Sequence, residues 1–186
     1  MKGYIYRLYG GSDPAKGWIF NDPIFGSPPT LGACVPNLRR AVELGDWVYC
    51  ISGRVATHQP YVVGGFQVEQ KISALQAYER FPQYRLDRSE NGQNVGNVIV
   101  DEAGNHHQLD KHDNFEGRVE NYLVGGESFF VSEPAQIERA RSETVPVLSK
   151  IFQKAANRSF DIVPRWRRME EAQINEMNVW LRSLTR

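Results

Sequence analysis

The chain has 186 residues, of which 41% are hydrophobic and 24% are charged. These are ordinary globular values, so the composition excludes a disordered chain and fits one domain with an appendage. The 22 Lys and Arg residues balance 22 Asp and Glu residues, which excludes a bulk polycation but allows a local basic patch. The longest apolar run, Trp47 to Ile51, is too short to span a membrane, and the N-terminus has no apolar signal segment. We therefore expect a cytoplasmic protein whose cysteines, Cys34 and Cys50, are reduced.

The N-terminal part of the chain predicts a strand, a loop, a helix and a second strand. The strand over 4–9 alternates tyrosines with a β-branched residue. The stretch 13–29 holds too many prolines and glycines for a helix and predicts a long loop, a type that is often functional. A short helix is expected over 36–46, where Pro36 suits the first turn. A buried strand then follows over 46–52.

The middle of the chain predicts a hairpin and further short strands. Residues 61–70 form the return arm of an antiparallel hairpin, and their double glycine predicts a bulge or a sharp bend. A helix is expected over 71–80, followed by strands over 97–105 and 122–132. Closure of these mostly antiparallel strands into a small bent barrel is expected, because closure removes exposed strand edges.

The last third of the chain is helical in pattern. Apolar stripes predict helices over 135–140, 148–155 and 167–184. We therefore assign the chain to the α+β class and divide it into a barrel domain, 1–133, and a helical extension, 134–186, packed on the barrel.

One ordered combination of local features is more specific than its parts. The segment PNLRRAVELGDWVYCIS, residues 36–52, joins a helix to a strand through a Gly-Asp turn, and YVVGGFQVEQ, residues 61–70, returns as the next strand. This order resembles the PUA-like superfold, in particular its EVE, YTH and ASCH branches, over about residues 4–70. The resemblance implies a barrel that receives a nucleobase in a pocket beside its first strand.

A narrower resemblance covers the loop and the helix. The segment NDPIFG, residues 21–26, followed by TLGACVPNLRRAVELGDWV, residues 30–48, is similar to the nucleotide-modification-associated domains of prokaryotes and phages. The matching positions are Thr30, Leu31, Cys34, Pro36, Arg39, Arg40, Ala41, Gly45, Asp46 and Trp47. Val35 departs from the pattern, because the family usually has a lysine there. The resemblance implies a role around modified DNA or nucleotides, including phage defence.

The candidate ligand-binding residues combine aromatic rings that stack on a base with polar groups that bond its edge. They are Tyr6, Trp18, Phe20, Thr30, Arg39, Trp47, Ser52 and Arg54. Structural alternatives stand beside them: core packing for Trp47, a solvated helix face for Arg39 and a turn hydroxyl for Ser52. We expect their pocket between the first strand, the loop from Trp18 to Thr30 and the strand end at Ser52 to Arg54.

Basic residues interleaved with aromatics near the C-terminus predict a surface that follows a nucleic-acid backbone. With one arginine from the predicted helix over 36–46, the candidates are Arg40, Lys150, Lys154, Arg165, Arg167 and Arg168. The alternatives are a charged helix flank balanced by Glu170 and Glu171, or a surface that docks a partner. A homodimer through the C-terminal helices is one such prediction.

Catalytic signals are sparse. Cys34 precedes a helix start, where the helix dipole lowers a thiol pKa, but no histidine is visibly paired with it. The run from His106 to Asp113 contains metal-type ligands whose spacing matches no zinc motif, so we expect a solvated loop, no metal and no cofactor. We therefore predict a module that binds a modified or flipped nucleobase in DNA, or a nucleotide. The alternatives are an enzyme of nucleotide or base modification that uses the same pocket, and a structural domain.

Overall fold

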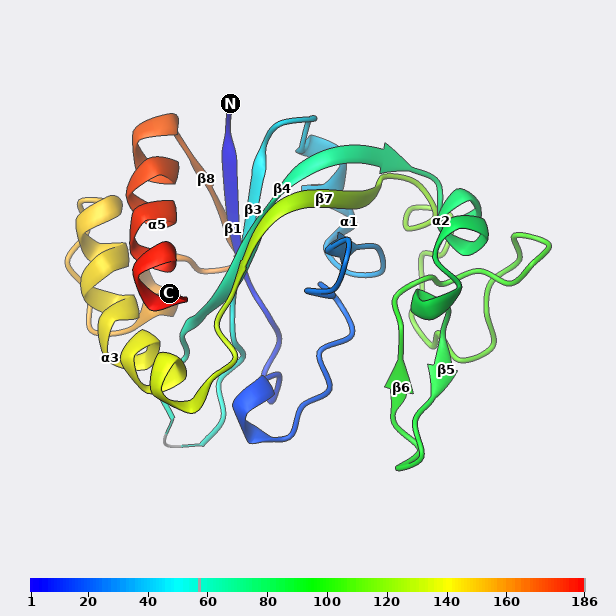
Figure 1. Cartoon of the computed structure of the whole chain (residues 1–186), viewed down its shortest axis with the longest axis horizontal. Helices are drawn as coiled ribbons and strands as arrows, with labels where there is room; N and C mark the ends of the chain where they lie inside the picture. Colours follow the sequence, from blue (N-terminus) through cyan, green and yellow to red (C-terminus); the bar gives the residue numbers. More distant parts are fainter. Residues whose placement is uncertain (57, 186) are drawn as a thin grey trace. The chain divides into compact units, whose positions relative to one another are not determined.

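A computed structural model describes residues 1–56 and 58–185 and shows mixed α+β content (Figure 1). In chain order the elements are β1 (Gly3–Arg7), η1 (Pro14–Lys16), β2 (Thr30–Leu31), α1 (Pro36–Ala41), β3 (Trp47–Ile51), β4 (Val62–Ile72), α2 (Ala74–Arg80), η2 (Pro82–Tyr84), β5 (Asp87–Arg88), β6 (Asn94–Val95), β7 (Tyr122–Phe130), α3 (Pro134–Ile151), α4 (Ser159–Ile162), β8 (Trp166–Met169) and α5 (Glu171–Leu184). The described helices include none with the length and apolar character needed to cross a membrane.

The main sheet has six strands in the order β2-β7-β4-β3-β1-β8, and β5 with β6 forms a separate hairpin. Because this order ends at β2 and β8, the described strands form no closed barrel, and that part of the prediction was wrong. The pairs β3–β4, β1–β8 and β2–β7 are antiparallel, as expected for most of the sheet, whereas β1 and β3 are parallel. The register of β3 with β4 shifts between Cys50 and Ile51, whose partners are Gly64 and Val62, so the predicted bulge is confirmed.

The chain packs as two units, and neither is a continuous stretch of sequence. The first comprises Met1–Trp18, Gly45–Gln67 and Glu127–Arg186, and the second comprises Ile19–Leu44 and Val68–Gly126. The helices expected to form an extension therefore belong to the same unit as β1 and β3. Strands β4 and β7 contribute residues to both units.

In the first unit, α5 packs against the strands through its predicted apolar stripe. Ile174, Met177 and Leu181 are buried, and a Cβ on Gly3 would lie 2.7 Å from Ile174 Cγ1, so only a glycine lets the helix approach β1 this closely. The Tyr49 hydroxyl on β3 donates to Asn178 Oδ1 on α5 at 2.7 Å. Helices α3 and α5 lie side by side (Figure 1).

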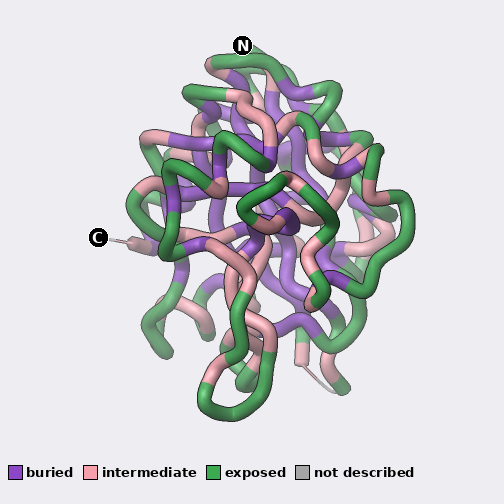
Figure 2. Tube along the Cα trace, turned by 90° about the vertical axis from the view of Figure 1, so that its right-hand side faces the viewer, coloured by how far each residue is buried: buried purple, intermediate pink, exposed green. Residues whose placement is uncertain are grey.

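The second unit has its own apolar core. Figure 2 shows which parts of the chain trace are buried, intermediate or exposed. This core joins α2 to β7 and to the irregular segment around Val98. Its buried members are Ala74, Ala77, Phe81, Tyr84, Val98, Val100, Tyr122 and Val124. Helix α2 starts at a Ser73 capping box, in which Ser73 accepts from Gln76 N and Gln76 accepts from Ser73 N.

Four expected elements differ from the structure. The helix expected over 36–46 is α1, which ends at Ala41. The helix predicted over 167–184 begins only at Glu171, because Trp166–Met169 pairs with β1 as strand β8 and a capping box at Glu170 starts α5. The helices predicted over 135–140 and 148–155 are one helix, α3, which ends at Ile151 and contains Pro146. The segment 97–105 makes only isolated bridges, although it is buried from residue 97 to residue 100.

Gly53, which follows β3, lies against the loop that follows β1. A Cβ at this position would lie 1.9 Å from the carbonyl oxygen of Tyr9 and 2.8 Å from the nitrogen of Ser12. Both contacts are with backbone, which cannot rotate away as a side chain does. Gly53 therefore holds the two segments in close contact.

We expect Gly53→Ala to lower the free energy of unfolding by about 2 kcal/mol and Tm by roughly 6 °C, because the loop at Tyr9 must move to admit a methyl group. Thermal unfolding followed by circular dichroism measures this shift. Gly10→Ala is the matched control, since a Cβ there meets no atom within 4 Å. Equal Tm values for the two variants would contradict the close contact.

Candidate functional site

Three segments that are distant in sequence meet at one edge of the first unit. Strands β1 and β3 are parallel and in register from Gly3–Trp47 to Arg7–Ile51, so both end at the same edge. The connection from β3 to the antiparallel strand β4 leaves from that edge. Strand β8 runs antiparallel to β1, so the residues that precede it also lie there.

These segments enclose a cavity with a volume of about 580 Å³, which is in the range of small-molecule sites. We call it the arginine pocket. Its lining residues are Arg7, Arg54, Ala56, His58, Gln59, Pro60, Arg158, Ser159, Phe160, Asp161 and Pro164. Of the residues predicted from the sequence to bind a ligand, only Arg54 lines this pocket.

Positive charge dominates the arginine pocket. The Arg7 guanidinium lies over the Phe160 ring, 4.6 Å from its centroid. Among the described residues, the Arg54 side chain has no hydrogen-bonding or ionic partner. Arg158 donates from Nε and Nη2 to the two carboxylate oxygens of Asp161, at 2.9 and 2.7 Å. These hydrogen bonds lower the pKa of Asp161, so the pocket contains three guanidinium groups and one carboxylate.

Two polar groups in the pocket lack partners among the described residues. Ser159 is 1% exposed, and its hydroxyl oxygen is buried without a hydrogen bond. His58 Nδ1 is also buried without a hydrogen bond. A buried hydroxyl without a partner is unfavourable by about 1–3 kcal/mol, and a ligand that accepts from it removes that penalty. The pocket therefore has unused hydrogen-bonding capacity as well as charge.

The loop after β1 is attached to the strand end that carries Arg54. Gly11 N donates to Arg54 O at 2.9 Å, and Gly53 N donates to Ser12 O at 2.7 Å. Farther along the loop, half-buried Trp18 packs edge-to-face against exposed Tyr9, with ring centroids 5.1 Å apart. The segment from Tyr9 to Ser12 thus adjoins the strand end at Gly53 and Arg54.

Other predicted residues of the first unit lie inside the fold. Tyr6 is 1% exposed on β1, and Trp47 is stacked on Tyr49 and Phe129 at 5.6 and 5.7 Å. The Ser52 hydroxyl is fully buried and accepts from Tyr61 N at 3.1 Å, which holds the start of β4 against the end of β3. Trp47 therefore packs in the core, and the Ser52 hydroxyl serves a backbone hydrogen bond, which are the structural alternatives that the sequence left open for both residues.

A buried ion pair fixes the loop that contains Trp18. Asp13 is completely buried, caps η1 through Ala15 N and accepts from Arg141 Nη2 at 3.0 and 2.7 Å. Arg141 on α3 also donates to Gln59 O at 2.5 Å and lies over the Tyr61 ring. One arginine thus connects α3, the loop after β1 and the start of β4.

The remaining ligand candidates belong to the second unit. Phe20 stacks on Phe25 at 5.6 Å, and buried Thr30 accepts from Asn97 Nδ2 at 3.0 Å. Arg39 is 0% exposed, and burial lowers the pKa of its guanidinium, an effect that the Asp22 carboxylate opposes. Its guanidinium donates to four backbone carbonyl oxygens, those of Cys34, Arg118, Glu120 and Asn121. Arg39 is therefore neither on a solvated face nor exposed to a ligand.

Asp22 organises the segment that precedes α1. Its carboxylate accepts from the backbone N–H groups of Gly32, Ala33 and Cys34 and from Asn97 Nδ2. Burial raises the pKa of the Cys34 thiol, and the Asp22 carboxylate raises it further. A thiol held in its neutral form is a poor nucleophile, so this geometry gives no support to catalysis by Cys34.

In the run from His106 to Asp113, two histidines contact the Asp110 carboxylate. This 8%-exposed aspartate accepts from Arg118 Nη1 at 2.5 Å and contacts His106 Nε2 and His112 Nδ1 at 2.9 and 2.7 Å. Burial raises the pKa of Asp110, but hydrogen bonds from Arg118, His112 and His106 lower it more, to about 2. Among the described residues no group of three or more His, Cys, Asp or Glu side chains is arranged for a metal ion.

Most of the predicted backbone-contacting residues already have partners. Lys150 pairs with Glu176, Lys154 donates to Asp161 O, Arg167 donates to Ile162 O and Arg168 pairs with Glu170. Arg40 and Arg165 are exposed, and Arg165 O accepts from Arg7 N at 3.0 Å. Arg165, Arg167 and Arg168 lie along β8 or directly before it, rather than on the predicted helix.

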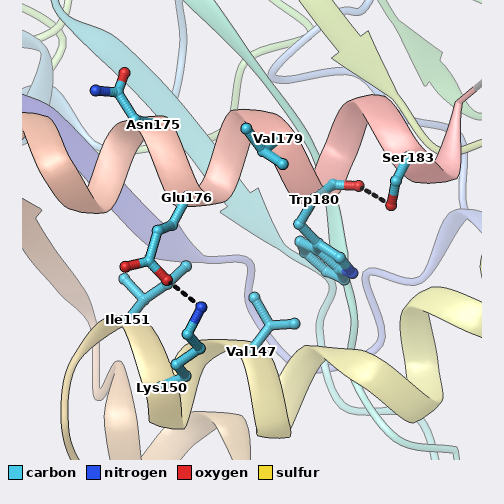
Figure 3. A pocket seen from close by; sticks show the side chains of 8 residues that line it. All are labelled: Val147, Lys150, Ile151, Asn175, Glu176, Val179, Trp180 and Ser183. Atoms are coloured by element: carbon cyan, nitrogen blue, oxygen red, sulfur yellow. Dashed lines mark hydrogen bonds and ion pairs between the residues drawn. The ribbon is translucent and has the colours of Figure 1, made fainter.

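Two further cavities among the described residues have weaker charge patterns. A groove of about 380 Å³ between α3 and α5 is mostly apolar, and its Lys150 and Glu176 neutralise each other (Figure 3). Nothing in it singles out a second copy of the chain, so the predicted homodimer stays a prediction. In the second unit, a cavity of about 620 Å³ has Asp87, Asp101 and Glu102 in its lining. Neither gathers several guanidinium groups as the arginine pocket does.

Comparisons with known proteins identify no relative of this chain. No family model matches the chain, and neither a curated protein nor a solved structure matches it.

Of the residues that line the arginine pocket, the sequence predicts Arg54 as a ligand-binding residue but not Arg7, His58, Arg158, Ser159 or Phe160. One available signal was Arg7, a charged residue at the end of an otherwise apolar strand. The role of Ser159 had no such signal, because a buried serine without a partner is recognisable only in three dimensions.

The low pKa of Asp110 predicts acid-dependent stability. Ionised Asp110 stabilises the fold above about pH 4, and this contribution falls as the pH drops from the ordinary pKa of 3.8 to about 2. The shift corresponds to about 2 kcal/mol. We expect Asp110→Asn to be less stable by at least about this amount at pH 6, with the difference shrinking between pH 4 and pH 2, as measured by urea unfolding. The exposed Asp113→Asn is the control, and a pH-independent deficit for Asp110→Asn would contradict the assignment.

The raised pKa of Cys34 predicts a slow thiol. At pH 8 we expect the folded protein to react with a chromogenic disulfide reagent at least about tenfold more slowly than the protein unfolded in guanidinium, in which two thiols react. Cys34→Ser identifies which thiol contributes to any residual rate. If the folded protein rapidly released one equivalent of the chromophore and Cys34→Ser did not, this assignment would be overturned and the enzyme alternative favoured.

Proposed function

We propose that the chain is a binding module for nucleic acid or a nucleotide, and that the arginine pocket contacts the phosphate. The observation that carries this proposal is the convergence of Arg7, Arg54 and Arg158 around a cavity with unpartnered Ser159. Guanidinium groups match phosphate oxygens geometrically and retain their charge at any working pH.

The electrostatics of the chain as a whole strengthen this argument. Several other arginines pair with a carboxylate: Arg141 with Asp13, Arg118 with Asp110 and Arg139 with Glu143. In the arginine pocket, three guanidinium groups face only Asp161 among the lining carboxylates. Like charges repel at such a site unless an anion joins them, so an anionic ligand is the natural partner.

The finer part of the proposal concerns the base. The resemblance to PUA-like and nucleotide-modification-associated domains suggests that a modified or flipped base binds near the loop after β1. Trp18 and Tyr9 supply aromatic surface for stacking there, and this loop hydrogen-bonds to the backbone at Arg54. Stacking would offset the unpairing of a flipped base, which costs a few kcal/mol.

Fluorescence anisotropy with a short, 5′-phosphorylated single-stranded oligonucleotide tests the proposal. We expect Arg7→Gln and Arg54→Gln each to weaken binding about three- to tenfold and to reduce the salt dependence by about one phosphate contact. Trp18→Ala should weaken binding without changing the salt dependence, because stacking involves no ion release.

Arg88→Gln is the matched control, since Arg88 is an exposed arginine of the second unit whose side chain donates to the Gly92 carbonyl. Unchanged binding by the pocket variants, or an equal loss in Arg88→Gln, would refute a specific phosphate contact. If no oligonucleotide binds at all, the nucleic-acid part of the proposal fails, and if no nucleotide binds either, the proposed function fails as a whole.

A further inference from the structure

The donor set of the arginine pocket bears on the kind of phosphate it holds. An internal phosphodiester carries one negative charge and two terminal oxygens, whereas a phosphate monoester carries close to two charges and three terminal oxygens. The three guanidinium groups of the pocket, less the Asp161 carboxylate, leave a charge of plus two. This charge balance matches a monoester better than a diester.

The position of the donors supports the same choice. Arg7 is held from one side by the Phe160 ring, which leaves its N–H groups available at the edge of the guanidinium plane. Ser159 lines the cavity and is 1% exposed, and its hydroxyl oxygen is buried without a hydrogen bond, so a ligand oxygen that reaches it must enter the cavity rather than pass across its mouth. A terminal phosphate can enter in this way, because only one of its oxygens continues into a chain.

Asp161 acts on the pocket as an internal competitor. Its two oxygens accept from Nε and Nη2 of Arg158, which is the two-pronged arrangement that a phosphate would use. A ligand phosphate must therefore share or replace these hydrogen bonds and tolerate a neighbouring negative charge. The second charge of a monoester helps it to compete where a diester would not.

We infer that the arginine pocket is a site for the terminal phosphate monoester of a nucleotide or oligonucleotide, bound by Arg7, Arg54, Arg158 and Ser159, with Asp161 as the group that the phosphate displaces. The inference rests on the proposed function for its ligand class. It goes further in naming the chain end, rather than the chain interior, as the part that is recognised.

Matched ligands test the inference at pH 8, where the monoester is fully ionised. Binding is compared for one oligonucleotide with a 5′-phosphate, the same oligonucleotide with a 5′-hydroxyl, and adenosine 5′-monophosphate. We expect the 5′-phosphate to tighten oligonucleotide binding about tenfold. Arg54→Gln and Ser159→Ala should each reduce this ratio, and circular dichroism confirms that the variants fold.

Asp161→Asn provides a variant that gains affinity. It keeps the shape of the side chain but removes the competing charge, so we expect monoester binding to tighten about three- to tenfold. Glu176→Gln is the control, because it removes a carboxylate paired with Lys150 outside the pocket and should change nothing. A loss of affinity in Asp161→Asn would overturn the role of Asp161.

The outcomes separate the two proposals. Equal binding of the phosphorylated and unphosphorylated oligonucleotides would overturn the inference and leave nucleic-acid binding standing. Binding of adenosine monophosphate without binding of either oligonucleotide would overturn nucleic-acid binding, support the monoester site and identify a free nucleotide as its source. Binding of neither the monophosphate nor the phosphorylated end would overturn the inference.

Discussion

The parallel pairing of β1 with β3 is the constraint on which the candidate site depends. Parallel strands end at the same edge of a sheet, so Arg7 and the segment that carries Arg54 emerge together although 46 residues separate their positions in the numbering. Antiparallel pairing with β4 and β8 then brings the β3–β4 connection and the segment before β8 to that edge. The cavity is thus a consequence of strand direction, and its arginines are positioned by the backbone rather than by one another.

The two units use charge differently in their interiors. In the second unit, Arg39 and Arg118 donate to carbonyl oxygens of neighbouring segments, and Asp22 and Asp110 supply the compensating charge. In the first unit, the buried pair Asp13–Arg141 joins a helix to two loops. Such buried groups must remain paired, because removal of one partner leaves an uncompensated charge in the interior. Arg54 differs from these buried arginines, because it is exposed and its side chain has no partner among the described residues, so it is available to bind a ligand.

The sequence allowed correct prediction of elements whose signals are local. Pro36 and the apolar positions after it predicted α1, and the double glycine of β4 predicted its bulge. The α+β class followed from the same patterns. The apolar stripe of α5 predicts a helix from residue 167 onward, but Glu170 and Gln173 form a capping box, which is the local signal that the helix begins after Glu170.

Other features depend on contacts between distant segments and had no local signal. An arginine in a helix is usually exposed to solvent. Arg39 is instead buried, because its guanidinium donates to backbone carbonyl oxygens about 80 positions later in the chain. The sequence predicts sheet closure because closure removes exposed strand edges, but the strand order is open at both ends, at β2 and at β8. The site was only partly foreseen, through Arg54, because the segment carrying Arg158 and Ser159 reaches it by the pairing of β8.

Strand β8 also has a consequence for how copies of this protein behave toward each other. As the outermost strand next to β1, it has one side on which no described strand pairs with it, and such an edge can recruit a strand from another molecule. The residues at this edge include exposed Trp166 and Arg168, with exposed Arg165 directly before the strand. Arg168 pairs with Glu170, but repulsion between the exposed Arg165 residues of two copies opposes their approach, so positive charge beside this strand protects it from edge-to-edge aggregation.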